Sequence, residues 1–527
     1  MLLQKQFFGH ESVMMLSKEL LYISRSNIST EINKTGSWRF LTPIYQLKSS
    51  PCTEKCPLSQ DISRIEMLVS KGKFKEAIDL ILLENPFPSV CGHVCFHTCE
   101  TACNRKSFDE PVGIHSIERF LGNIAIAEDY KLNIPIISFN GKNIAILGAG
   151  PSGLGAAYFM RILGYNCDVF EIKKEPGGLL RWGIPAYRLP DLVLRKEILR
   201  IESLGVKIHC NSKETVDSLK KSGKYDAIFI GCGYGKPVKM GIDGEDLAID
   251  GLEFLYKIRN GENTDIGGHV AVIGGGNSAI DVSRSLIRIG ATPIIFYRRR
   301  IEDMPAFKEE VEAANVEGVE IRELTKPIRI EKDSEGLVIT LNNNNTFKAQ
   351  HVIKAIGNEA ENHWKLLLDS KENFSKFSRT VLVNNHLPIV LGGDLVNPVK
   401  SVADAIASGK QAAMVLDSFF NHREVTNSMD IYTGGDRKNR SKHITSIEEI
   451  NLDYFEFSPR RDSEIEEAKR CFNCGICNDC DNCRIFCPEI SVNFKDNKRS
   501  INLDYCKGCG ICITECPRNA MGLREEA

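Results

Sequence analysis

Apolar residues follow two alternating patterns between Asn143 and Met414. Short runs such as Ile144–Leu147 have the length and composition of strands that are buried on both faces. Longer stretches such as Ala156–Leu163 repeat apolar residues at helical spacing. Strands that alternate with helices in this way are typical of parallel sheets covered by helices, so we expect an α/β fold.

The patterns before and after this region are different. Two helical stretches, Asp61–Ser70 and Lys73–Leu83, are followed by the helix-stopping sequence Asn-Pro-Phe-Pro. The first 23 residues predict an amphipathic helix, because charged residues interrupt the apolar run that a signal peptide needs. Residues 421–462 are polar and poorly periodic, and they predict a linker.

A glycine-rich turn connects the first strand of the middle region to its first helix. Gly148, Gly150 and Gly153 have the G-x-G-x-x-G spacing that allows a tight turn, close approach of a pyrophosphate and close packing of the helix. A second strand, Asp168–Phe170, ends at Glu171, where a ribose hydroxyl needs an acceptor. The combination predicts a dinucleotide site of the flavin type.

Further loops predict contacts to the same cofactor. A Gly- and Pro-rich loop at 177–185 and the Arg-Leu-Pro sequence after it are able to lie along a flat ligand. Small residues let the chain pass close to a cofactor at 231–233 and 355–357, and a Gly-Gly-Asp at 392–394 precedes a helix whose N-terminus would face the flavin ring. The candidates from these loops are Gly178, Leu179, Arg188, Gly233, Gly357, Gly393, Asp394 and Val402.

A second dinucleotide unit begins at His269. Gly274 and Gly276 repeat the first two glycines of the fingerprint, Ala279 replaces the third, and Asn277 opens the helix between them. The unit therefore predicts a second nucleotide site in the same chain.

The strand Pro293–Tyr297 of this second unit ends in three arginines rather than in an acid. Guanidinium groups at this position suit a 2′-phosphate, so Arg298 and Arg299 predict NADPH rather than NADH. The alternative is that these arginines form only a solvated surface run. Their position directly after the second strand favours the phosphate.

The composition of the chain argues against nucleic-acid and membrane binding and favours metal ligation. The chain has 527 residues, enough for three or four domains, and a formal net charge of -2, which gives no general attraction to nucleic acid or anionic lipid. No apolar run approaches the roughly 18 residues of a membrane span. Of nineteen cysteines, six lie between Cys52 and Cys103 and ten between Cys471 and Cys516. Such clusters in a long chain without secretory traits favour metal ligation over disulfides and predict a cytoplasmic protein.

Two cysteine runs in the tail have the same spacing, C-x2-C-x2-C-x3-C-P. This doubled spacing is that of a bacterial two-cluster ferredoxin, in which the fourth cysteine of each run serves the other cluster. Structural zinc is disfavoured, because zinc sites use two well-separated cysteine pairs. The expected 4Fe–4S ligands are Cys477, Cys480, Cys483 and Cys516 for one cluster, and Cys506, Cys509, Cys512 and Cys487 for the other.

Residues 51–425 resemble the small (beta) subunit of NADPH-dependent glutamate synthase and the N-terminal region of dihydropyrimidine dehydrogenase. The resemblance rests on PCTEKCP, NPFPSVCGHVC with CETAC, VGIHSIERF, the two nucleotide fingerprints, YRRRIEDMPA, and GGD with DAIASGKQAA. Together with the tail, the chain is similar to beta subunits of NADPH-dependent iron oxidoreductases and to electron-input subunits of some 2-oxoacid oxidoreductases. The GSWR segment at 36–39 resembles small subunits of the latter.

The resemblance implies a helical domain with two 4Fe–4S clusters, an FAD domain into which an NADPH domain is inserted, and electron flow between NADPH and an external redox partner. Carried over from the family, the ligands of one helical-domain cluster would be Cys56, Cys95, Cys99 and Glu118. Cys91 precedes a glycine of the family pattern and is not expected to ligate.

The other helical-domain cluster of the family uses the equivalents of Cys52 and Cys103 with an upstream C-x2-C pair, but no cysteine precedes Cys52 here. The tail has two cysteines beyond its ferredoxin runs, Cys471 and Cys474, at the missing spacing. We therefore expect the tail to fold back, so that these four residues hold a fourth cluster within one chain or between two. The alternative is that Cys471 and Cys474 are unligated.

These features predict the order of domains. The expected segments are an N-terminal extension (1–50), a helical iron–sulfur domain (51–135), a first part of the FAD-binding domain (141–260), an NADPH-binding domain (267–356), a second part of the FAD-binding domain (357–422), a linker (423–465) and a ferredoxin-like domain (466–527).

The expected function is that of an NADPH-dependent FAD iron–sulfur oxidoreductase, which passes hydride from NADPH to FAD and single electrons through four clusters to a partner. No acid–base catalytic residue is expected, since the cofactors carry the chemistry. The alternatives are an electron-input subunit of a 2-oxoacid:acceptor oxidoreductase complex, a non-catalytic electron-wiring scaffold, and a disulfide reductase, which would need a cysteine pair beside the flavin that is missing around 177–181. The partner's identity and the oligomeric state are left open.

Overall fold

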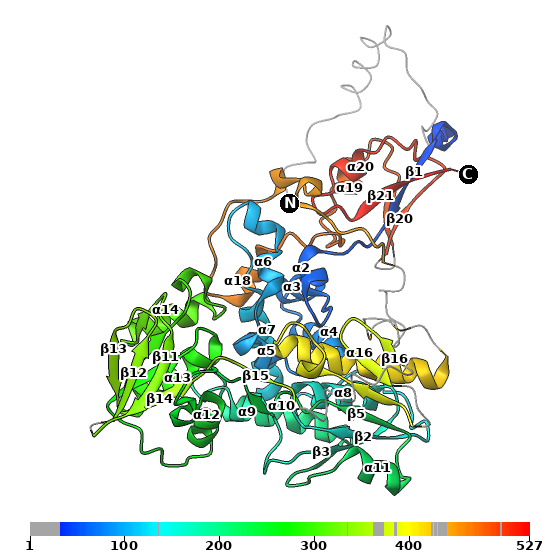
Figure 1. The fold of residues 1–527 in the computed structure, drawn as a ribbon. Helices are drawn as coiled ribbons and strands as arrows, with labels where there is room; N and C mark the ends of the chain where they lie inside the picture. Colours follow the sequence, from blue (N-terminus) through cyan, green and yellow to red (C-terminus); the bar gives the residue numbers. More distant parts are fainter. Residues whose placement is uncertain are drawn as a thin grey trace, which may run out of the picture.

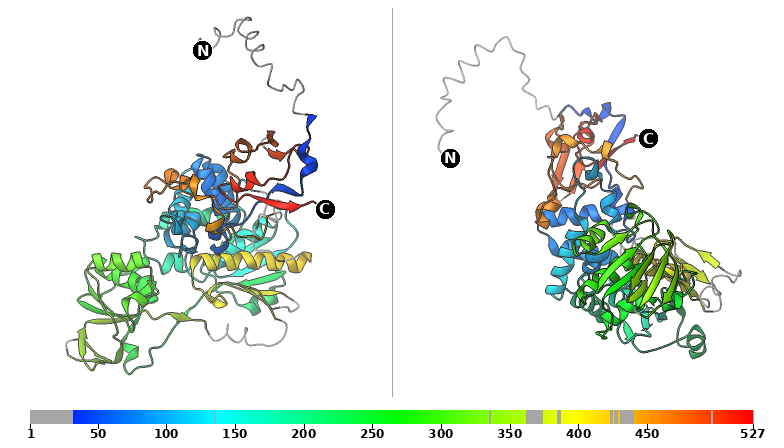
Figure 2. Two further views of the ribbon diagram at one scale, coloured as in Figure 1. Left: turned by 90° about the horizontal axis from the view of Figure 1, so that it is seen from above. Right: turned by 60° about the vertical axis from the view of Figure 1, so that its left-hand side comes forward.

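The computed structural model describes residues 32–134, 136–334, 336–361, 374–383, 387–422, 425, 429, 440–495 and 498–526 (Figure 1). The amphipathic helix expected over the first 23 residues lies outside this part of the chain. Two α/β domains lie side by side at the lower end of Figure 1, a helical domain lies above them, and the cysteine-rich tail lies at the upper end. Figure 2 shows the same order from two further sides.

The first α/β domain is built from two separate stretches of the chain. Its elements are β2 (Asn143–Leu147), α8 (Pro151–Ile162), β3 (Asn166–Phe170), α9 (Leu179–Trp182), α10 (Asp191–Ser203), β4 (Lys207–His209), α11 (Val216–Ser222), β5 (Ala227–Ile230), β16 (Phe374–Lys376), β17 (Val381–Val383), β18 (Ile389–Leu391), η6 (Gly393–Leu395) and α16 (Val402–Asn421). The sheet has the order β16-β17-β18-β5-β2-β3-β4. The strands from β18 to β4 are parallel, as the buried apolar runs predict, whereas β16 and β17 are antiparallel additions at one edge.

The second α/β domain is inserted into the first. Its elements are η4 (Glu245–Leu247), β7 (Ile249–Asp250), α12 (Gly251–Arg259), β8 (His269–Ile273), α13 (Asn277–Arg288), β9 (Thr292–Phe296), η5 (Ile301–Asp303), α14 (Lys308–Val316), β10 (Glu320–Arg322), β11 (Pro327–Lys332), β12 (Leu337–Leu341), β13 (Thr346–Ala349) and β14 (His351–Lys354). A parallel sheet of order β10-β9-β8-β14-β7 and a separate sheet of order β11-β12-β13 form it. Where the chain enters and leaves the insertion, β6 (Lys236–Pro237) and β15 (Asn358–Glu359) pair antiparallel.

The helical domain contains the two helices that the periodicity predicts. Its elements are α2 (Pro51–Lys55), α3 (Ile62–Ser70), α4 (Phe74–Glu84), α5 (Pro88–Val94), α6 (Thr98–Thr101), η3 (Asn104–Ser107) and α7 (Ile114–Ala127). The predicted stretches correspond to α3 and α4, with Asp61 and Lys73 at the N-cap positions. Helix α5 ends at Val94, and Cys95 is its C-cap residue. Cys91, Cys95, Cys99 and Cys103 are spaced by four residues in the sequence, but they therefore do not share one continuous helix.

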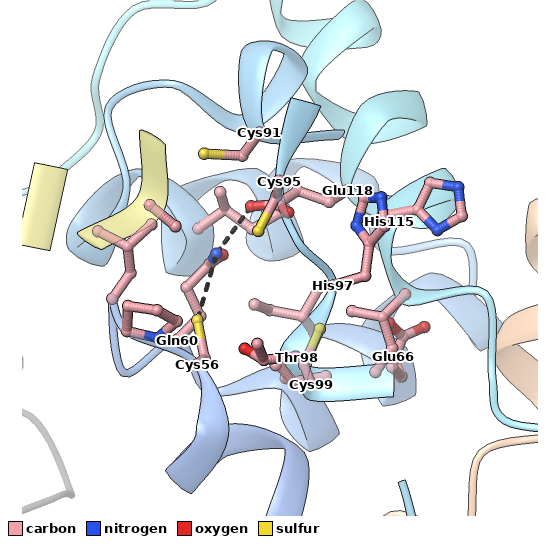
Figure 3. A pocket seen from close by; sticks show the side chains of 17 residues that line it. Cys56, Gln60, Glu66, Cys91, Cys95, His97, Thr98, Cys99, His115 and Glu118 are labelled. Atoms are coloured by element: carbon pink, nitrogen blue, oxygen red, sulfur yellow. Dashed lines mark hydrogen bonds between the residues drawn. The ribbon is translucent and has the colours of Figure 1, made fainter. Parts of the chain in front are cut away.

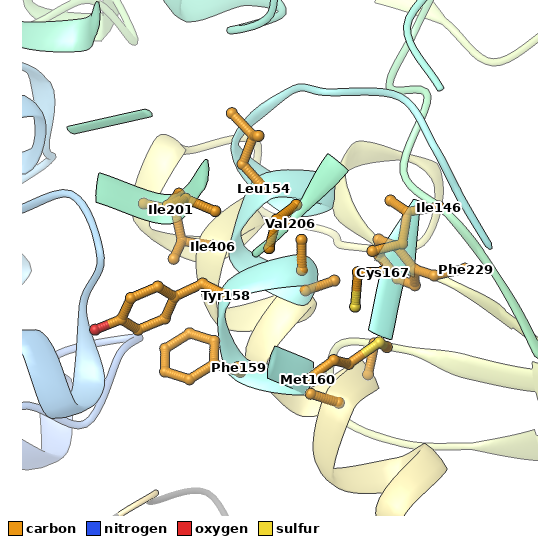
Figure 4. Close-up of a cluster of buried hydrophobic side chains, with 14 of the residues drawn as sticks. Ile146, Leu154, Tyr158, Phe159, Met160, Cys167, Ile201, Val206, Phe229 and Ile406 are labelled. Carbon is orange, nitrogen blue, oxygen red and sulfur yellow. The ribbon is translucent and has the colours of Figure 1, made fainter. Parts of the chain in front are cut away.

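One apolar core joins the helical domain to the first α/β domain. Figure 4 shows its centre, where Tyr158 and Phe159 of α8 lie with Ile406 of α16. Phe87 and Val90 of the helical domain belong to the same core. The inserted domain has cores of its own. The helical and first α/β domains are therefore packed as one unit.

The N-terminal extension completes the tail rather than standing apart from it. The elements are η2 (Thr35–Trp38), β1 (Leu41–Tyr45), η8 (Ile447–Glu449), η9 (Leu452–Tyr454), α18 (Glu464–Lys469), α19 (Asn482–Ile485), β19 (Val492–Lys495), β20 (Lys498–Ile501), α20 (Ile511–Thr514) and β21 (Met521–Glu525). Strand β1 pairs antiparallel with β21 over five residues. The sequence carries no motif in this extension that predicts the pairing.

The segment expected to be a linker is packed where the structure describes it. Ile444 forms a bridge with Ser49, and the Arg440 guanidinium pairs with Asp61 at 2.6 Å, with both side chains buried. Helix α18 lies against the helical domain. The described part of this segment therefore packs against the helical domain through contacts that include a buried ion pair. Among the described helices, none is long and apolar enough to span a membrane.

Candidate functional site

The glycine fingerprint of the first α/β domain has the geometry that a dinucleotide requires. Gly148 has φ +96, and a Cβ on Gly153 would collide with the Gly148 carbonyl oxygen, so both positions require glycine. Gly150 is the N-cap of α8, and the Cα of Gly178, 3.8 Å from an ideal Cβ, is its nearest neighbour. The open backbone at Gly150 therefore fits a pyrophosphate at the start of α8.

Two acidic residues and the N-terminus of one helix lie beside this fingerprint. Glu171 is buried beside the fingerprint, where its carboxylate accepts hydrogen bonds from the Ala149 N–H at 2.8 Å and the Lys173 N–H at 2.9 Å. Asp394 follows β18, and burial raises the pKa of its carboxyl. Ser401 caps α16 through a hydrogen bond from the Asp404 N–H at 3.0 Å. The end of β3, the end of β18 and the start of α16 thus meet at the carboxyl edge of the sheet, where ligands bind in such folds.

The remaining loop candidates are glycines with positive φ or the first residues of helices, with one exception. Gly233 and Gly357 have φ +67 and +102, and Leu179 begins α9 beside Gly178. Gly393 has φ +63 and donates its N–H to Ser408 Oγ at 2.7 Å. Val402 is the first residue of α16. The exception is Arg188.

The side chain of Arg188 lies between the two α/β domains. Its guanidinium pairs with Asp281 at 2.8 Å and with Glu310 at 3.0 Å, and it lies 5.7 Å from the Phe307 ring centroid. These partners belong to the inserted domain, so Arg188 connects the domains instead of pointing into the fingerprint of either one.

The second fingerprint is also shaped for a nucleotide. Gly274 has φ +144, where a Cβ would collide with the Ala355 carbonyl, and Gly276 has open space around it. Asn277 begins α13, and its Oδ1 accepts a hydrogen bond from the Phe307 N–H at 2.9 Å. Ala279 is buried in the core of this domain, so its methyl group fits where the first fingerprint has a glycine.

Arg298 and Arg299 follow β9 and are exposed. Within the described residues, no ion pair or hydrogen bond engages either guanidinium group. Both are therefore available to an anion at the end of this strand, the position that a 2′-phosphate occupies in such folds.

Three cysteines and one carboxylate line a cavity in the helical domain. Figure 3 shows Cys56, Cys95, Cys99 and Glu118 around it. Burial raises the pKa of all three thiols, that of Cys95 to about 12. Buried thiols without a charge partner are costly to ionise, but iron supplies that charge, so this donor set fits an iron–sulfur cluster.

Glu118 is held in place by two amide side chains. Gln60 Nε2 and Asn85 Nδ2 donate to its Oε1 at 2.7 and 2.8 Å. Burial raises the pKa of Glu118 to about 7. Cys91 is also near the cavity, but its thiol donates to Asn85 Oδ1 at 3.9 Å and it is buried in the apolar core.

The structure brings Cys471 and Cys474 of the tail to Cys52 and Cys103 of the helical domain, within one chain. Burial raises the pKa of all four thiols. The four groups also act on one another, because Cys103 and Cys474 raise the pKa of Cys52, and Cys52 and Cys474 raise that of Cys471. The four donors thus form one buried group from the two ends of the chain, and this donor set also fits a cubane cluster.

Hydrogen bonds point at these sulfurs. Ser50 Oγ lies 3.1 Å from Cys52 Sγ, Asn104 Nδ2 lies 3.4 Å from Cys474 Sγ, and the Asn473 N–H lies 3.4 Å from Cys471 Sγ. Donors of this kind stabilise thiolate ligands and tune the potential of the cluster that they hold. Sequence reasoning missed Ser50 and Asn104.

Two buried arginines hold the tail against the helical domain beside these cysteines. Arg105 pairs with Asp109 at 2.7 Å and donates to the Arg470 carbonyl, and Arg470 pairs with Asp109 at 3.2 Å and with Glu467 at 2.6 Å. Each of these side chains is at most 4% exposed. Because unpaired buried charges are strongly destabilising, the network favours one arrangement of the two segments.

The two tail cysteine sets line two separate cavities. One cavity has Cys477, Cys480, Cys483 and Cys516 on its walls, and the other has Cys487, Cys506, Cys509 and Cys512. These are the two groupings that the interleaved ferredoxin spacing predicts. Sequence reasoning missed Tyr45, whose hydroxyl lies 3.3 Å from Cys483 Sγ.

The two halves of the tail repeat the same backbone conformations 29 residues apart. Asp479 and Gly508 have φ 66 and 72, Asp481 and Gly510 have φ 72 and 79. Ile490 and Asn519 likewise have φ 49 and 56. The left-handed region suits glycine and asparagine, but it is strained for a β-branched residue, so Ile490 is the one costly choice among these six positions.

Two histidines and one glutamate, which the sequence does not predict to be a site, lie near the helical-domain cavity. His97, Glu100 and His115 could converge on a metal ion, but the Arg460 guanidinium already pairs with Glu100 at 2.7 Å. His115 holds Glu100 Oε1 at 2.6 Å. The arrangement acts as a contact between α6, α7 and the segment before α18.

Comparisons with known proteins agree with this geometry. Residues 44–130 match the model for dihydropyrimidine dehydrogenase domain II with a 4Fe-4S cluster, residues 142–409 match that for pyridine nucleotide-disulphide oxidoreductases, and residues 499–521 match a 4Fe-4S binding domain. These matches confirm the fold class expected from the sequence.

Several curated relatives are dehydrogenase or oxidoreductase subunits by name. The chain is 28% identical over 510 residues to the NADP(+)-dependent formate dehydrogenase subunit beta of Moorella thermoacetica, covering 81% of this chain and 71% of that one. It is 36% identical over 294 residues to the NADPH-Fe(3+) oxidoreductase subunit beta of Geobacter sulfurreducens (54% and 44%). It is 29% identical over 383 residues to the NAD-dependent dihydropyrimidine dehydrogenase subunit PreT of Escherichia coli (70% and 91%). The chain thus spans less than half of the Geobacter protein.

The strained residue of the tail repeat generates a prediction. Ile490→Asn should stabilise the tail by about 1 kcal/mol, because Asn tolerates a positive φ and Ile490 is exposed, so little packing is lost. The midpoint of urea unfolding, followed by cluster absorbance, measures the change. The reciprocal variant Asn519→Ile should destabilise the tail by more than that, because it also removes the hydrogen bond from the buried Lys48 Nζ to Asn519 Oδ1 at 2.5 Å. Stabilisation by both variants would contradict the backbone argument.

Proposed function

Because the chain belongs to the pyridine nucleotide-disulphide oxidoreductase family, we propose that it is an NADPH-linked flavin and iron–sulfur subunit that moves electrons between NADPH and a partner protein. When bound, FAD supplies two-electron chemistry with the nicotinamide, and 4Fe–4S clusters supply one-electron steps. The observation that carries the proposal is that one chain holds two nucleotide grooves and four four-donor groups arranged in series.

Contacts between neighbouring donor groups support this series. Ala403 of α16, whose first turn faces the flavin groove, lines the cavity of Cys56, Cys95 and Cys99. The pKa of the buried Cys99 is raised further by Cys52 of the next group. The Arg518 guanidinium, whose pKa burial lowers, interacts with Cys471 on one side and with tail cysteines such as Cys480 on the other.

The last step of the series lies in the tail. Burial, together with neighbouring cysteines that include Cys506 and Cys483 of the other tail group, raises the pKa of Cys512 to about 12. The outermost group of Cys487, Cys506, Cys509 and Cys512 lies near exposed apolar side chains, among them Ile490 and Ile511. This end of the molecule offers a surface on which a redox partner could dock.

The ligand assignments follow from the same groups. We assign one cluster to Cys56, Cys95, Cys99 and Glu118, and one to Cys52, Cys103, Cys471 and Cys474. The other two clusters belong to the two tail groups. Fifteen cysteines and one glutamate then give sixteen ligands for four clusters.

A disulfide reductase mechanism has no support in this chain. All nineteen cysteines lie within the described residues, and none of them forms a disulfide. Cys167 is buried in the core of the first α/β domain, and the Cys232 thiol donates a hydrogen bond to the Leu147 carbonyl oxygen at 3.5 Å. Groups of cysteines that ligate clusters fit a reducing compartment, which supports a cytoplasmic location.

Anaerobic reduction by NADPH tests the function. Addition of NADPH to the flavin- and iron-loaded protein should bleach the flavin absorbance first and the visible cluster absorbance afterwards. A stopped-flow spectrophotometer records both changes. A loaded protein whose flavin stays oxidised would support the non-catalytic scaffold instead.

Nucleotide choice depends on the two exposed arginines. Replacing both Arg298 and Arg299 by Gln should weaken NADPH binding at least about a hundredfold, because each of the two charge-assisted hydrogen bonds contributes roughly 1.5–3 kcal/mol, and should leave NADH binding nearly unchanged. Isothermal titration with both nucleotides measures the effect. Arg300→Gln, next along the same run, is the matched control. Equal losses for NADPH and NADH would rule out the phosphate contact.

The fourth donor group has its own test. Cys471→Ser with Cys474→Ser should lower the iron content from about 16 to about 12 atoms per chain, since one cubane loses half of its ligands. Iron analysis of anaerobically purified protein measures this. Cys91→Ser, a buried cysteine outside the assigned groups, should leave the iron content unchanged. An unchanged content in the double variant would remove these residues from the assignment.

A further inference from the structure

A buried ion pair joins the flavin-binding domain to the helical domain next to the cavity of Cys56, Cys95, Cys99 and Glu118. Lys410 of α16 donates to Glu84 Oε2 at 2.7 Å and also to the Leu58 carbonyl. Lys410 and Glu84 are each 2% exposed. A buried ion pair adds little or no stability relative to apolar residues of the same size, so stability alone gives no reason for one here.

The position of Lys410 is fixed by a close helix crossing. A Cβ on Gly409, its neighbour in α16, would collide with the Ser152 carbonyl oxygen and with the Ala156 nitrogen of α8. Gly155 of α8 approaches Ile406 in the same way, with its ideal Cβ 3.2 Å from the Ile406 carbonyl oxygen. The two helices thus meet backbone to backbone, which fixes the backbone of Lys410, while the Glu84 carboxylate and the Leu58 carbonyl hold its ammonium.

The ammonium group acts on the cavity from close range. Leu58, whose carbonyl accepts from Lys410, lines the cavity and follows Cys56 by two residues. Burial raises the pKa of Cys56, and the Lys410 charge opposes that rise. Glu84 is adjacent in sequence to Asn85, whose amide holds Glu118 Oε1 at 2.8 Å. Lys410 is therefore bonded to a residue that lines the cavity, and Glu84 is the sequence neighbour of a residue that holds the proposed ligand Glu118.

We propose that Lys410 is a positioning residue that raises the reduction potential of the cluster held by Cys56, Cys95, Cys99 and Glu118, and that Glu84 limits this effect. Reduction adds one electron to the cluster, with no bond formed or broken, so a nearby fixed cation favours the reduced form. Helix α16 begins beside the proposed flavin site and also carries Lys410, so one helix would connect the flavin to the positive charge beside this cluster. The inference rests on the proposed function, since it needs a cluster at this site.

The two members of the pair predict shifts in opposite directions. Lys410→Met removes the cation and should lower the ratio of reduced to oxidised cluster at a fixed potential about tenfold, equivalent to about 59 mV for one electron. Glu84→Gln removes one negative charge that pairs with this cation and should raise the ratio. Lys410→Arg keeps the charge and should restore a ratio near that of the wild type.

The measurement is a redox titration of the loaded protein, followed by electron paramagnetic resonance. The signal of this cluster is the one that Cys95→Ser lacks, and the other three clusters serve as internal controls. Lys142→Met, which removes an ammonium that pairs with Asp226 at the surface of the same domain, is the matched control. Thermal midpoints are recorded in parallel, because a purely structural role lowers stability in both variants and moves the potential in neither.

Opposite shifts in Lys410→Met and Glu84→Gln, confined to this cluster, are the expected result. Shifts of the same sign, or none, overturn the inference while the proposed function stands. If Lys410→Met fails to fold, Glu84→Gln alone must still raise the ratio, and an unchanged or lower ratio overturns the inference. Absence of the Cys95-dependent signal from the wild type overturns both this inference and the assigned ligand set.

Discussion

The return of the C-terminal segment to the helical domain is the constraint on which the rest of the structure depends. Cys471 and Cys474 lie with Cys52 and Cys103, more than 350 residues away along the chain. Such a contact between distant segments must offset a large loss of chain entropy. Buried pairs between Arg105, Asp109 and Arg470 hold the segments in register, since breaking any one of them leaves an uncompensated charge.

The flavin-binding domain is attached to the helical domain much more firmly than the inserted domain is. Tyr158 of α8 donates its hydroxyl to the Leu82 carbonyl at 2.6 Å inside a shared apolar core. The inserted domain has its own cores, and polar contacts such as that of Arg188 with Asp281 join it to its neighbour. Burial raises the pKa of Asp281 to about 6, and Arg188 opposes that rise. A rigid path between flavin and clusters thus coexists with a nucleotide domain that is packed separately.

The tail shows how a repeated sequence imposes a repeated backbone. The matching positive φ angles at Asp481 and Gly510 place the short helices α19 and α20 identically relative to their cysteines. A strand from outside the repeat is added to it, because β1 of the N-terminal extension pairs with β21. This pairing brings the Tyr45 hydroxyl to Cys483. Two small four-cysteine cavities leave little room for an apolar core, which is the physical reason that the tail needs this additional strand.

Local sequence determined the features whose causes lie within a few residues. The glycines at 148 and 153 specify a turn that other residues cannot form, and the cysteine spacings of the tail specify which sulfurs can reach one cavity. Ligand counting even led to Cys471 and Cys474 as partners of Cys52 and Cys103. The structure places these four side chains together, and their ligation of a cluster stays a prediction.

Tertiary packing decided what no local pattern carries. The contact of Arg188 with Asp281, the pairing of β1 with β21, and the burial of Lys410 against Glu84 each join residues that are far apart in the chain. The same side chains in another fold would be ordinary surface charges or an unremarkable apolar run. Their roles come from the groups packed around them, because burial and charge are properties of the assembled structure and not of the residue.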